Sequence, residues 1–165
     1  MRPALILGLL LVSSVALAGS ISKLNPADGS VLPESVAKTL LDQCSRTSPQ
    51  QVQGTWLPTP DQISELEARL PAALDEALGN QRNRFKQGYF RRQYVGFVIG
   101  QRKIIYVNAF PASAAEASPN VPESRHTFDW HNDAVIVCDG GPNYFGVEYD
   151  PSSKTFDHFA FNGFA

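Results

Sequence analysis

The sequence has few cysteines and little net charge, and each shortage excludes a class of protein. Its 165 residues include only two cysteines, which is too few for a small scaffold built on several disulfides and too few for a four-cysteine structural zinc site. The formal net charge is −2, whereas domains that bind nucleic acids are usually strongly basic. We therefore expect no nucleic-acid partner.

Long apolar runs are absent after the first 18 residues. The run at 4–17 follows the positively charged Arg2 and leads to the small residues Ala16 and Ala18, which is the pattern of a secretory signal peptide. It is shorter than the roughly 20 residues of a transmembrane helix. We predict that residues 1–18 are a cleaved signal peptide and that 19–165 form a single domain without a transmembrane segment. The protein is then periplasmic or secreted.

The two cysteines have a different meaning in an exported protein, because an oxidising compartment allows them to pair. Cys44 and Cys138 would close a loop of nearly one hundred residues, and such a bridge stabilises a fold by up to about 4.7 kcal/mol in the chain-entropy model. The alternative is a catalytic thiolate, which needs an electropositive, partly exposed setting. Cys138 instead follows the apolar residues 134–137. We predict a disulfide.

Leucine is absent after Leu78, and Trp56 is the one aromatic residue before Phe85. Leucine-rich sequence favours helices, whereas Phe, Tyr, Val and Ile favour strands. We therefore predict an α+β fold in which N-terminal helices, in a helical part over 19–80, pack on a C-terminal antiparallel meander of about five strands, in a sheet part over 81–165.

Two helices are expected in the first part. Apolar residues at helical spacing predict one over 33–44. The second begins at Thr59, which forms a capping-box sequence with Gln62, and it ends before Gly79. Pro71 lies inside it and predicts a kink or two abutting helices.

Five runs of β-branched and aromatic residues, separated by turn residues, predict the strands. They cover residues 91–99, 103–110, 134–138, 144–149 and 155–161. In the last of them, alternation along a strand should place Phe159 and Phe161 on one face and Phe156 on the other. At least one ring is then either exposed, where it could bind a protein partner, or covered by the long loop at 111–132. The link at 111–132 is longer than about 12–15 residues. Loops beyond that length are uncommon in compact domains and are usually functional or disordered.

Several short segments carry a resemblance. They are Gly54-Thr55-Trp56, ELEARLP at 65–71, CDGG at 138–141, FGVEYD at 145–150 and the closing Phe161-Asn162-Gly163. Together they are similar to small exported proteins of Gram-negative bacteria. The resemblance implies an exported location, and it implies no activity, cofactor or catalytic residue.

Acidic residues are absent between Glu76 and Glu116, and this stretch is rich in arginine and lysine. A cationic hairpin suits an anionic envelope component such as phosphorylated lipid headgroups or acidic glycans. Alternatively, these cations face the domain's own acids, for instance Glu148 and Asp150, or keep an edge strand soluble. The candidate binding residues are Arg82, Arg84, Arg91, Arg92, Trp130 and His131.

All three histidines lie in the last 40 residues, at His126, His131 and His158. Asp129 and Asp133 are near enough in sequence for a mixed metal site, and Ser124 could act as a nucleophile beside the first two histidines. However, the sequence lacks the H-E-x-x-H, G-x-S-x-G and S-x-x-K motifs. We therefore expect no catalytic residue, no metal and no cofactor.

These observations favour an exported binding domain without catalytic activity over an enzyme. Its partner would be an envelope protein or an anionic envelope polymer, contacted through the sheet face and the 111–132 loop. The alternative function is a small hydrolase or metal-dependent enzyme that uses the loop carrying His126, Asp129 and His131. A third is an assembly component that pairs through an edge strand.

Overall fold

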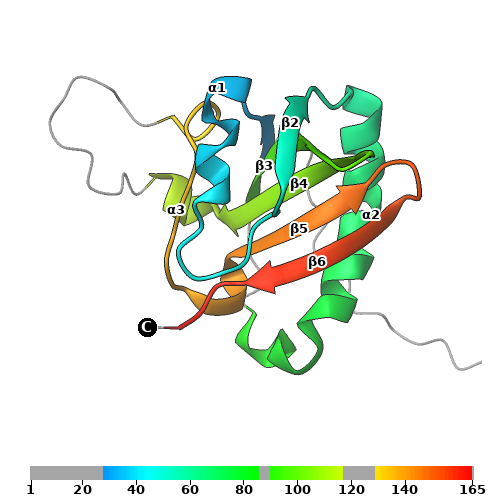
Figure 1. The fold of residues 1–165 in the computed structure, drawn as a ribbon. Coiled ribbons are helices and arrows are strands. Elements are labelled where there is room, and N and C mark those ends of the chain that lie inside the picture. The colour runs from blue at the N-terminus through cyan, green and yellow to red at the C-terminus, as the bar shows by residue number, and fades with distance from the viewer. Residues whose placement is uncertain (1–27, 86–89, 117–128, 165) are drawn as a thin grey trace, which may run out of the picture.

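The computed structural model describes residues 28–85, 90–116 and 129–164 (Figure 1). Its six strands form one mixed sheet, with a long helix on one face and short helices and loops on the other. The strands are β1 (Gly29–Val31), β2 (Val52–Trp56), β3 (Phe90–Ile99), β4 (Arg102–Pro111), β5 (Phe145–Asp150) and β6 (Thr155–Phe161). The helices are α1 (Glu34–Ala37), η2 (Thr39–Leu41), α2 (Pro60–Leu78), η3 (Gly79–Arg84), α3 (Ala112–Glu116) and η4 (Gly141–Asn143).

The sheet is mostly antiparallel. Strands β3, β4, β5 and β6 pair in chain order as a meander, which confirms the antiparallel pairing predicted for residues 91–99, 103–110, 144–149 and 155–161. The opposite edge of β3 is shared, because β1 pairs with its first half in parallel and β2 pairs with its second half in antiparallel orientation. Among the described helices, none has both the length and the apolar character required to cross a bilayer.

The predicted mixture of helices and antiparallel strands is confirmed, but the predicted division at residue 80 is wrong. Strands β1 and β2 precede α2 in the chain and belong to the same sheet as the later strands. Both were missed because β1 has three residues and β2 has five with a central Gly54, too few for an alternating pattern. Both segments form strands because their backbones pair with β3, which is distant in the sequence.

Helix α2 follows its sequence closely. The Thr59 side chain accepts a hydrogen bond from the Gln62 backbone N–H, and the Gln62 side chain accepts one from the Thr59 N–H, so the capping box is present. The helix continues through Pro71 as a single element and ends at Leu78. Gly79 follows with φ of 42°, in the left-handed region that glycine tolerates.

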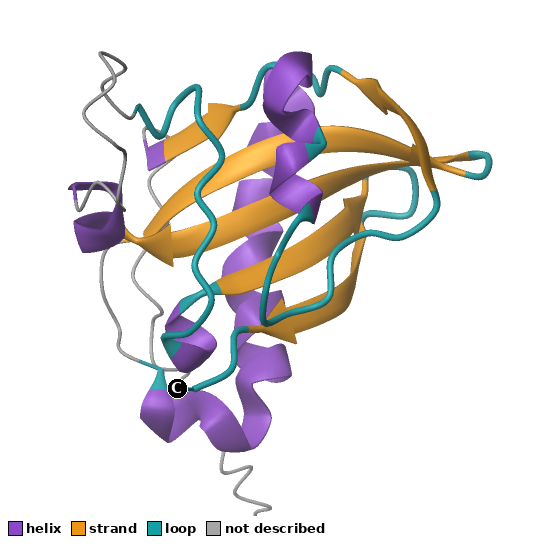
Figure 2. Cartoon of the chain, turned by 60° about the vertical axis from the view of Figure 1, so that its left-hand side comes forward, coloured by secondary structure: helices purple, strands orange, loops and turns teal. Residues whose placement is uncertain are grey.

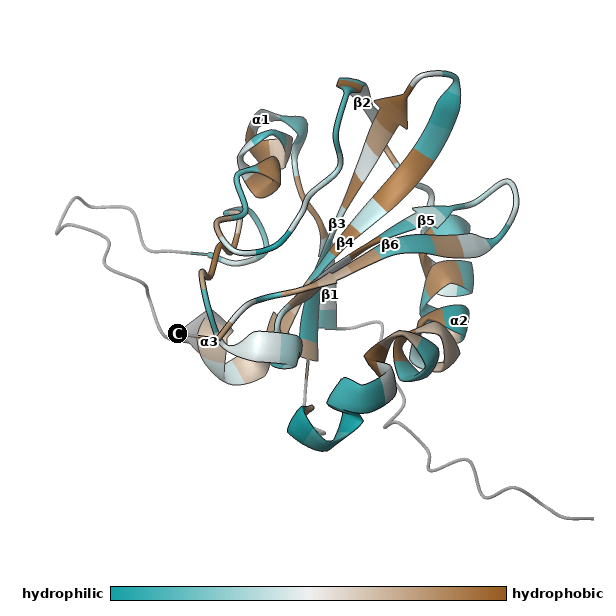
Figure 3. Ribbon diagram, turned by 60° about the horizontal axis from the view of Figure 1, so that its bottom comes forward, coloured by the Kyte–Doolittle hydropathy of each residue, from teal (hydrophilic) through white to brown (hydrophobic). Residues whose placement is uncertain are grey.

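The main core lies between α2 and the sheet. Leu66, Leu70, Leu74 and Leu78 pack on apolar side chains of β4 and β5. The colouring by hydropathy alternates along α2 and along the strands, as expected for elements that bury one face (Figure 3). The sheet residues of this core include Ile105, Val107, Ala109, Phe145, Val147 and Tyr149.

One ion pair is buried inside this apolar layer. Arg92 on β3 and Glu67 on α2 lie with Nη2 and Oε2 2.9 Å apart, and their side chains are 1% and 4% exposed. The Arg92 Nε donates to Glu67 Oε1 at 3.0 Å, and the Tyr94 hydroxyl donates to the same oxygen at 2.5 Å. This group connects the middle of the helix to the sheet.

A second, smaller core covers the opposite face. Ala37 and Leu40 pack on Val95, Phe97 and Ile104 of the sheet. The helix predicted over 33–44 is shorter than expected, because the chain forms only α1 and the 3₁₀ turn η2 before it becomes irregular. Loops then run across this face in front of the strands (Figure 2).

The prediction of a strand at 134–138 is wrong. This segment crosses the second face instead of joining the sheet edge, and side-chain amides satisfy its backbone. Gln93 Oε1 accepts from the Val135 N–H at 3.0 Å, and Asn108 Nδ2 donates to the Val135 carbonyl at 2.9 Å. Asn162 Nδ2 donates to the Val137 carbonyl at 2.6 Å. The apolar residues of this run are therefore not part of a β-ladder, and side chains provide hydrogen bonds to the backbone of the run.

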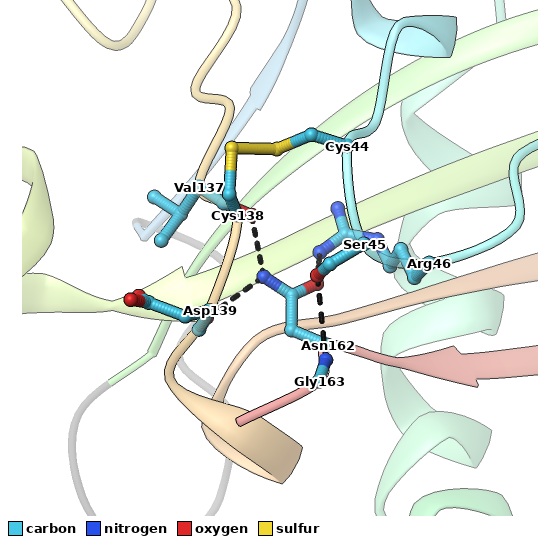
Figure 4. The surroundings of a disulfide bond; sticks show 8 residues. All are labelled: Cys44, Ser45, Arg46, Val137, Cys138, Asp139, Asn162 and Gly163. Carbon is cyan, nitrogen blue, oxygen red and sulfur yellow. Dashed lines mark hydrogen bonds between the residues drawn. A yellow bond between two sulfur atoms is a disulfide. The ribbon is translucent and has the colours of Figure 1, made fainter. Parts of the chain in front are cut away.

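The predicted disulfide is present, and it ties this segment to the chain after η2 (Figure 4). The two sulfur atoms of Cys44 and Cys138 lie 2.01 Å apart. Beside it, Arg46 Nη1 donates to Asn162 Oδ1 at 2.6 Å. The bridge and the hydrogen bond therefore fix the same stretch of chain.

Strand β6 contains an irregularity that changes which way its side chains face. Its register against β5 shifts between Gly146 and Glu148, and His158 has φ of 52°. The extra residue moves Phe156 to the face that carries Phe159 and Phe161, so all three rings pack on the main core. The prediction that Phe156 faces the other way is therefore wrong.

Candidate functional site

A pocket of about 480 Å³ lies on the second face of the sheet, under the segment at 47–51. This volume is within the range of pockets that hold small ligands, about 300–1,000 Å³. The segment supplies hydroxyl and amide groups as well as Pro49. The sheet supplies Ile99, Arg102, Tyr106, Glu148, His158 and Phe159.

Glu148 and His158 form an ion pair in this pocket. The His158 Nδ1 lies 3.1 Å from Glu148 Oε2, and its Nε2 lies 3.8 Å from Asp157 Oδ2. The Glu148 side chain is 10% exposed, whereas that of His158 is 61% exposed. The hydrogen bond and the charge of Glu148 raise the pKa of His158 above its ordinary value of 6.5. The pair thus joins a nearly buried anion to a cation at the solvent.

The backbone of the pocket is strained at two positions. Gln51 has φ of 57° and His158 has φ of 52°, and in the described chain only Lys154 among other non-glycine residues has a positive φ. Such conformations are unfavourable for residues with a Cβ, and they gather at functional sites. In a regular strand, His158 would point to the face opposite Asp157 and could not reach Glu148. The positive φ at His158 accompanies the orientation of its ring toward Glu148.

Tyr106 lines the pocket and connects it to a buried cation, Arg46. Its hydroxyl accepts from Arg46 Nε at 3.5 Å. Arg46 also donates to Asn162 and Asn108, and it immediately precedes the pocket segment. The position of the segment at 47–51 therefore depends on Arg46, and through it on the neighbouring disulfide.

The structure brings three of the predicted binding residues together elsewhere. The Arg91 guanidinium lies 4.8 Å from the Trp130 ring centroid, and the His131 ring lies 3.9 Å from it. Arg91 pairs with Asp28 at 3.3 Å, and His131 Nδ1 lies 2.8 Å from Asp129 Oδ1. Trp130 is itself 8% exposed, so its neighbours cover most of the ring.

The other candidate cations are dispersed. Arg82 pairs with Asp75, and the Arg84 guanidinium lies 5.3 Å from the Phe164 ring centroid. Arg92 is fully buried with Glu67, so its prediction as part of an exposed cationic surface is wrong. The alternative expectation describes this stretch better, because several of its cations face the domain's own acids. Arg102 does so with Asp150, at 4.0 Å.

The residues of the predicted enzyme loop are only partly described. Ser124 and His126 lie outside the described residues, as does the predicted signal peptide. In the parts of the chain that the structure describes, no three His, Cys, Asp or Glu side chains lie close enough to share a metal ion. His158 lies in the pocket, away from the Asp129–His131 pair, and shares no partner with it.

Sequence reasoning named Glu148 and His158 but did not combine them. Folding the chain about the turn at 150–153 places these residues almost opposite each other on a hairpin. The regular register pairs Glu148 with Asp157, and the irregularity in β6 brings the next residue, His158, to Glu148. The sequence carries no evident signal for that irregularity.

Neither the family models, nor the curated proteins, nor the solved structures include a match to this chain. Its function has to be inferred from the geometry of its own side chains.

The ion pair in the pocket can be tested by NMR titration of the histidine rings. We expect His158 to titrate above pH 6.5, and its pKa to fall in the Glu148→Gln variant. Asp157→Asn is the matched control and should lower this pKa less, because its carboxylate is 66% exposed and 3.8 Å away. The ion pair stabilises the fold fully when the pH is below 6.5, the ordinary pKa of histidine. This stabilisation is lost as the pH rises through the raised pKa of His158. An unchanged His158 titration in Glu148→Gln would contradict the assignment.

Proposed function

We propose that this protein is an exported binding domain without catalytic activity, and that it receives a small ligand in the pocket under residues 47–51. The proposal rests on three features that occur together. The cavity has the size of a small-ligand pocket. It contains the ion pair of the nearly buried Glu148 and the exposed His158, and the backbone at His158 is strained. Concave sites with a few converging polar groups and perturbed titratable residues are the usual binding sites of proteins.

The distribution of charge favours this pocket over a surface for an anionic envelope polymer. A polymer of that kind needs a cluster of unpaired cations. Arg82, Arg91 and Arg102 each lie within ion-pair distance of a carboxylate of the same chain, and Arg92 is buried. A small ligand, or an envelope protein that presents a small group to the pocket, fits the charges better.

An exported location is part of the same proposal. The disulfide supports it, because structural disulfides persist in oxidising compartments. The apolar run at 4–17 supports it independently as a signal-peptide pattern.

A ligand screen by NMR tests the proposal. Small amines, carboxylates and sugars are added to the labelled protein, and we expect at least one to shift the amide signals of residues 47–51 and 158–159. Thr47→Trp should abolish those shifts, because the indole fills the pocket from its exposed rim. Ser35→Trp, an exposed position on α1 outside the pocket, should leave them unchanged. The proposal fails if no compound shifts the pocket signals, or if the shifts survive Thr47→Trp.

A further inference from the structure

We propose that the pocket binds a small organic cation, a primary ammonium on an apolar stem, and that Glu148 is its anchoring carboxylate. This inference rests on the proposed function and specifies its ligand. The His158 side chain would then be the resident cation that the ligand displaces from Glu148.

Glu148 is suited to this role because it is a nearly buried carboxylate whose cation partner is exposed. A buried carboxylate is unfavourable unless a cation or several hydrogen bonds compensate its charge. Among the described residues, His158 supplies that charge at 3.1 Å, and it does so only while it is protonated. A ligand ammonium offers a permanent charge in its place, and the His158 side chain is free to move into solvent because it is 61% exposed.

The remaining charges around the pocket favour a cation over an anion. His158 faces Glu148 and Asp157, which are negative, and Arg102, which is positive. Arg102 is in turn near Asp150, at 4.0 Å. The buried guanidinium of Arg46 adds a second positive charge next to Tyr106. Once His158 is neutral, the three carboxylates of Glu148, Asp157 and Asp150 still outnumber these two guanidiniums, so the local charge becomes negative.

The walls of the pocket match an ammonium with an apolar stem. Ile99 and Pro49 supply apolar surface, and the ring of Tyr106 is one that attracts cations. An ammonium has three donors, and the lining residues Thr47 and Gln51 carry acceptor oxygens in addition to the carboxylate of Glu148. The volume of about 480 Å³ suits a small molecule.

Three probes with one stem and different charges test the inference. They are phenethylammonium, 2-phenylethanol and phenylacetate, each titrated into the labelled protein while the pocket amide signals are followed by NMR. We expect phenethylammonium to bind the most tightly of the three. Its affinity should rise from pH 6 to pH 8.5 as His158 loses its proton and stops competing for Glu148.

Two variants should change this affinity in opposite directions. Glu148→Gln should weaken phenethylammonium binding about tenfold or more, which is the loss expected for a hydrogen bond to a charged group. His158→Asn should strengthen binding at pH 6 and remove its pH dependence, and asparagine accepts the positive φ of this position. If Glu148→Gln does not fold, His158→Asn still decides the question. Thermal unfolding establishes that each variant is folded.

The outcomes separate the inference from the proposed function. Equal binding of all three probes, tighter binding of phenylacetate, or an affinity unaffected by both variants overturns the cation inference and leaves the pocket as a binding site. If none of the probes binds but a carboxylate or a sugar of the screen occupies the pocket, the inference is likewise overturned. If nothing binds the pocket at all, both fail.

Discussion

The Glu67→Ala variant is expected to lose about 3–5 kcal/mol of unfolding free energy, the usual effect of removing one partner from a buried ion pair. The Arg92 guanidinium would remain in an apolar layer without the carboxylate that now lies 2.9 Å away. The Tyr94 hydroxyl would lose its 2.5 Å acceptor as well. Urea unfolding followed by circular dichroism measures the change.

Glu65→Ala is the matched control on the same helix. Glu65 pairs with Arg69 at 3.5 Å and with Lys154 at 2.6 Å, but these partners are about half exposed. Exposed pairs contribute little to stability because water and salt screen them, so this variant should be nearly neutral. A loss at Glu67 no larger than the loss at Glu65 would show that the buried pair is not important to stability.

A double variant separates the worth of the pair from the penalty of breaking it. Glu67→Leu combined with Arg92→Met replaces both charges with apolar groups. Buried ion pairs replaced in this way often give stability equal to the original or higher. We therefore expect the double variant to recover most of the stability that Glu67→Ala loses, since its core then holds neither charge.

The contrast between α2 and residues 134–138 shows where sequence patterns succeed. The capping residues Thr59 and Gln62 act within one turn, so local sequence determines where the helix begins. The apolar run at 134–138 has the composition of a strand, but its hydrogen-bond partners are Gln93, Asn108 and Asn162, which are distant in the chain. Whether such a run joins a ladder depends on those partners, and composition carries no information about them.

The same limit applies to the pocket. Cations such as Arg91 and Arg92 are neighbours in sequence but lie on opposite faces of β3, because side chains alternate along a strand. A charge run therefore did not predict a charged surface. Glu148 and His158 meet only because the register of β6 shifts. The same shift goes together with the packing of Phe156 and Phe159 on the main core, which involves residues distant in the sequence.

Loss of the disulfide is expected to destabilise the fold by an amount similar to the loss in Glu67→Ala. Cys44 and Cys138 are 94 residues apart, and a loop of that size contributes up to about 4.7 kcal/mol by restricting the unfolded chain. For a domain of this size, Cys44→Ala with Cys138→Ala should lower the melting temperature by roughly 10 °C or more. Either single variant should match the double one, because each breaks the same bond. A reducing agent should lower the melting temperature of the native protein to the same value and leave that of the double variant unchanged.

The pocket should weaken together with the bridge. Arg46 is two residues after Cys44, and its hydrogen bonds to Tyr106 and Asn162 hold the beginning of the segment at 47–51. Without the bridge, this stretch is held by noncovalent contacts alone, so we expect faster hydrogen exchange at 47–51 at temperatures where the sheet amides of β4 remain protected. Conversely, a melting temperature within a few degrees of the native value, with unchanged exchange at 47–51, would mean that the buried amide and guanidinium contacts position the pocket without the covalent link.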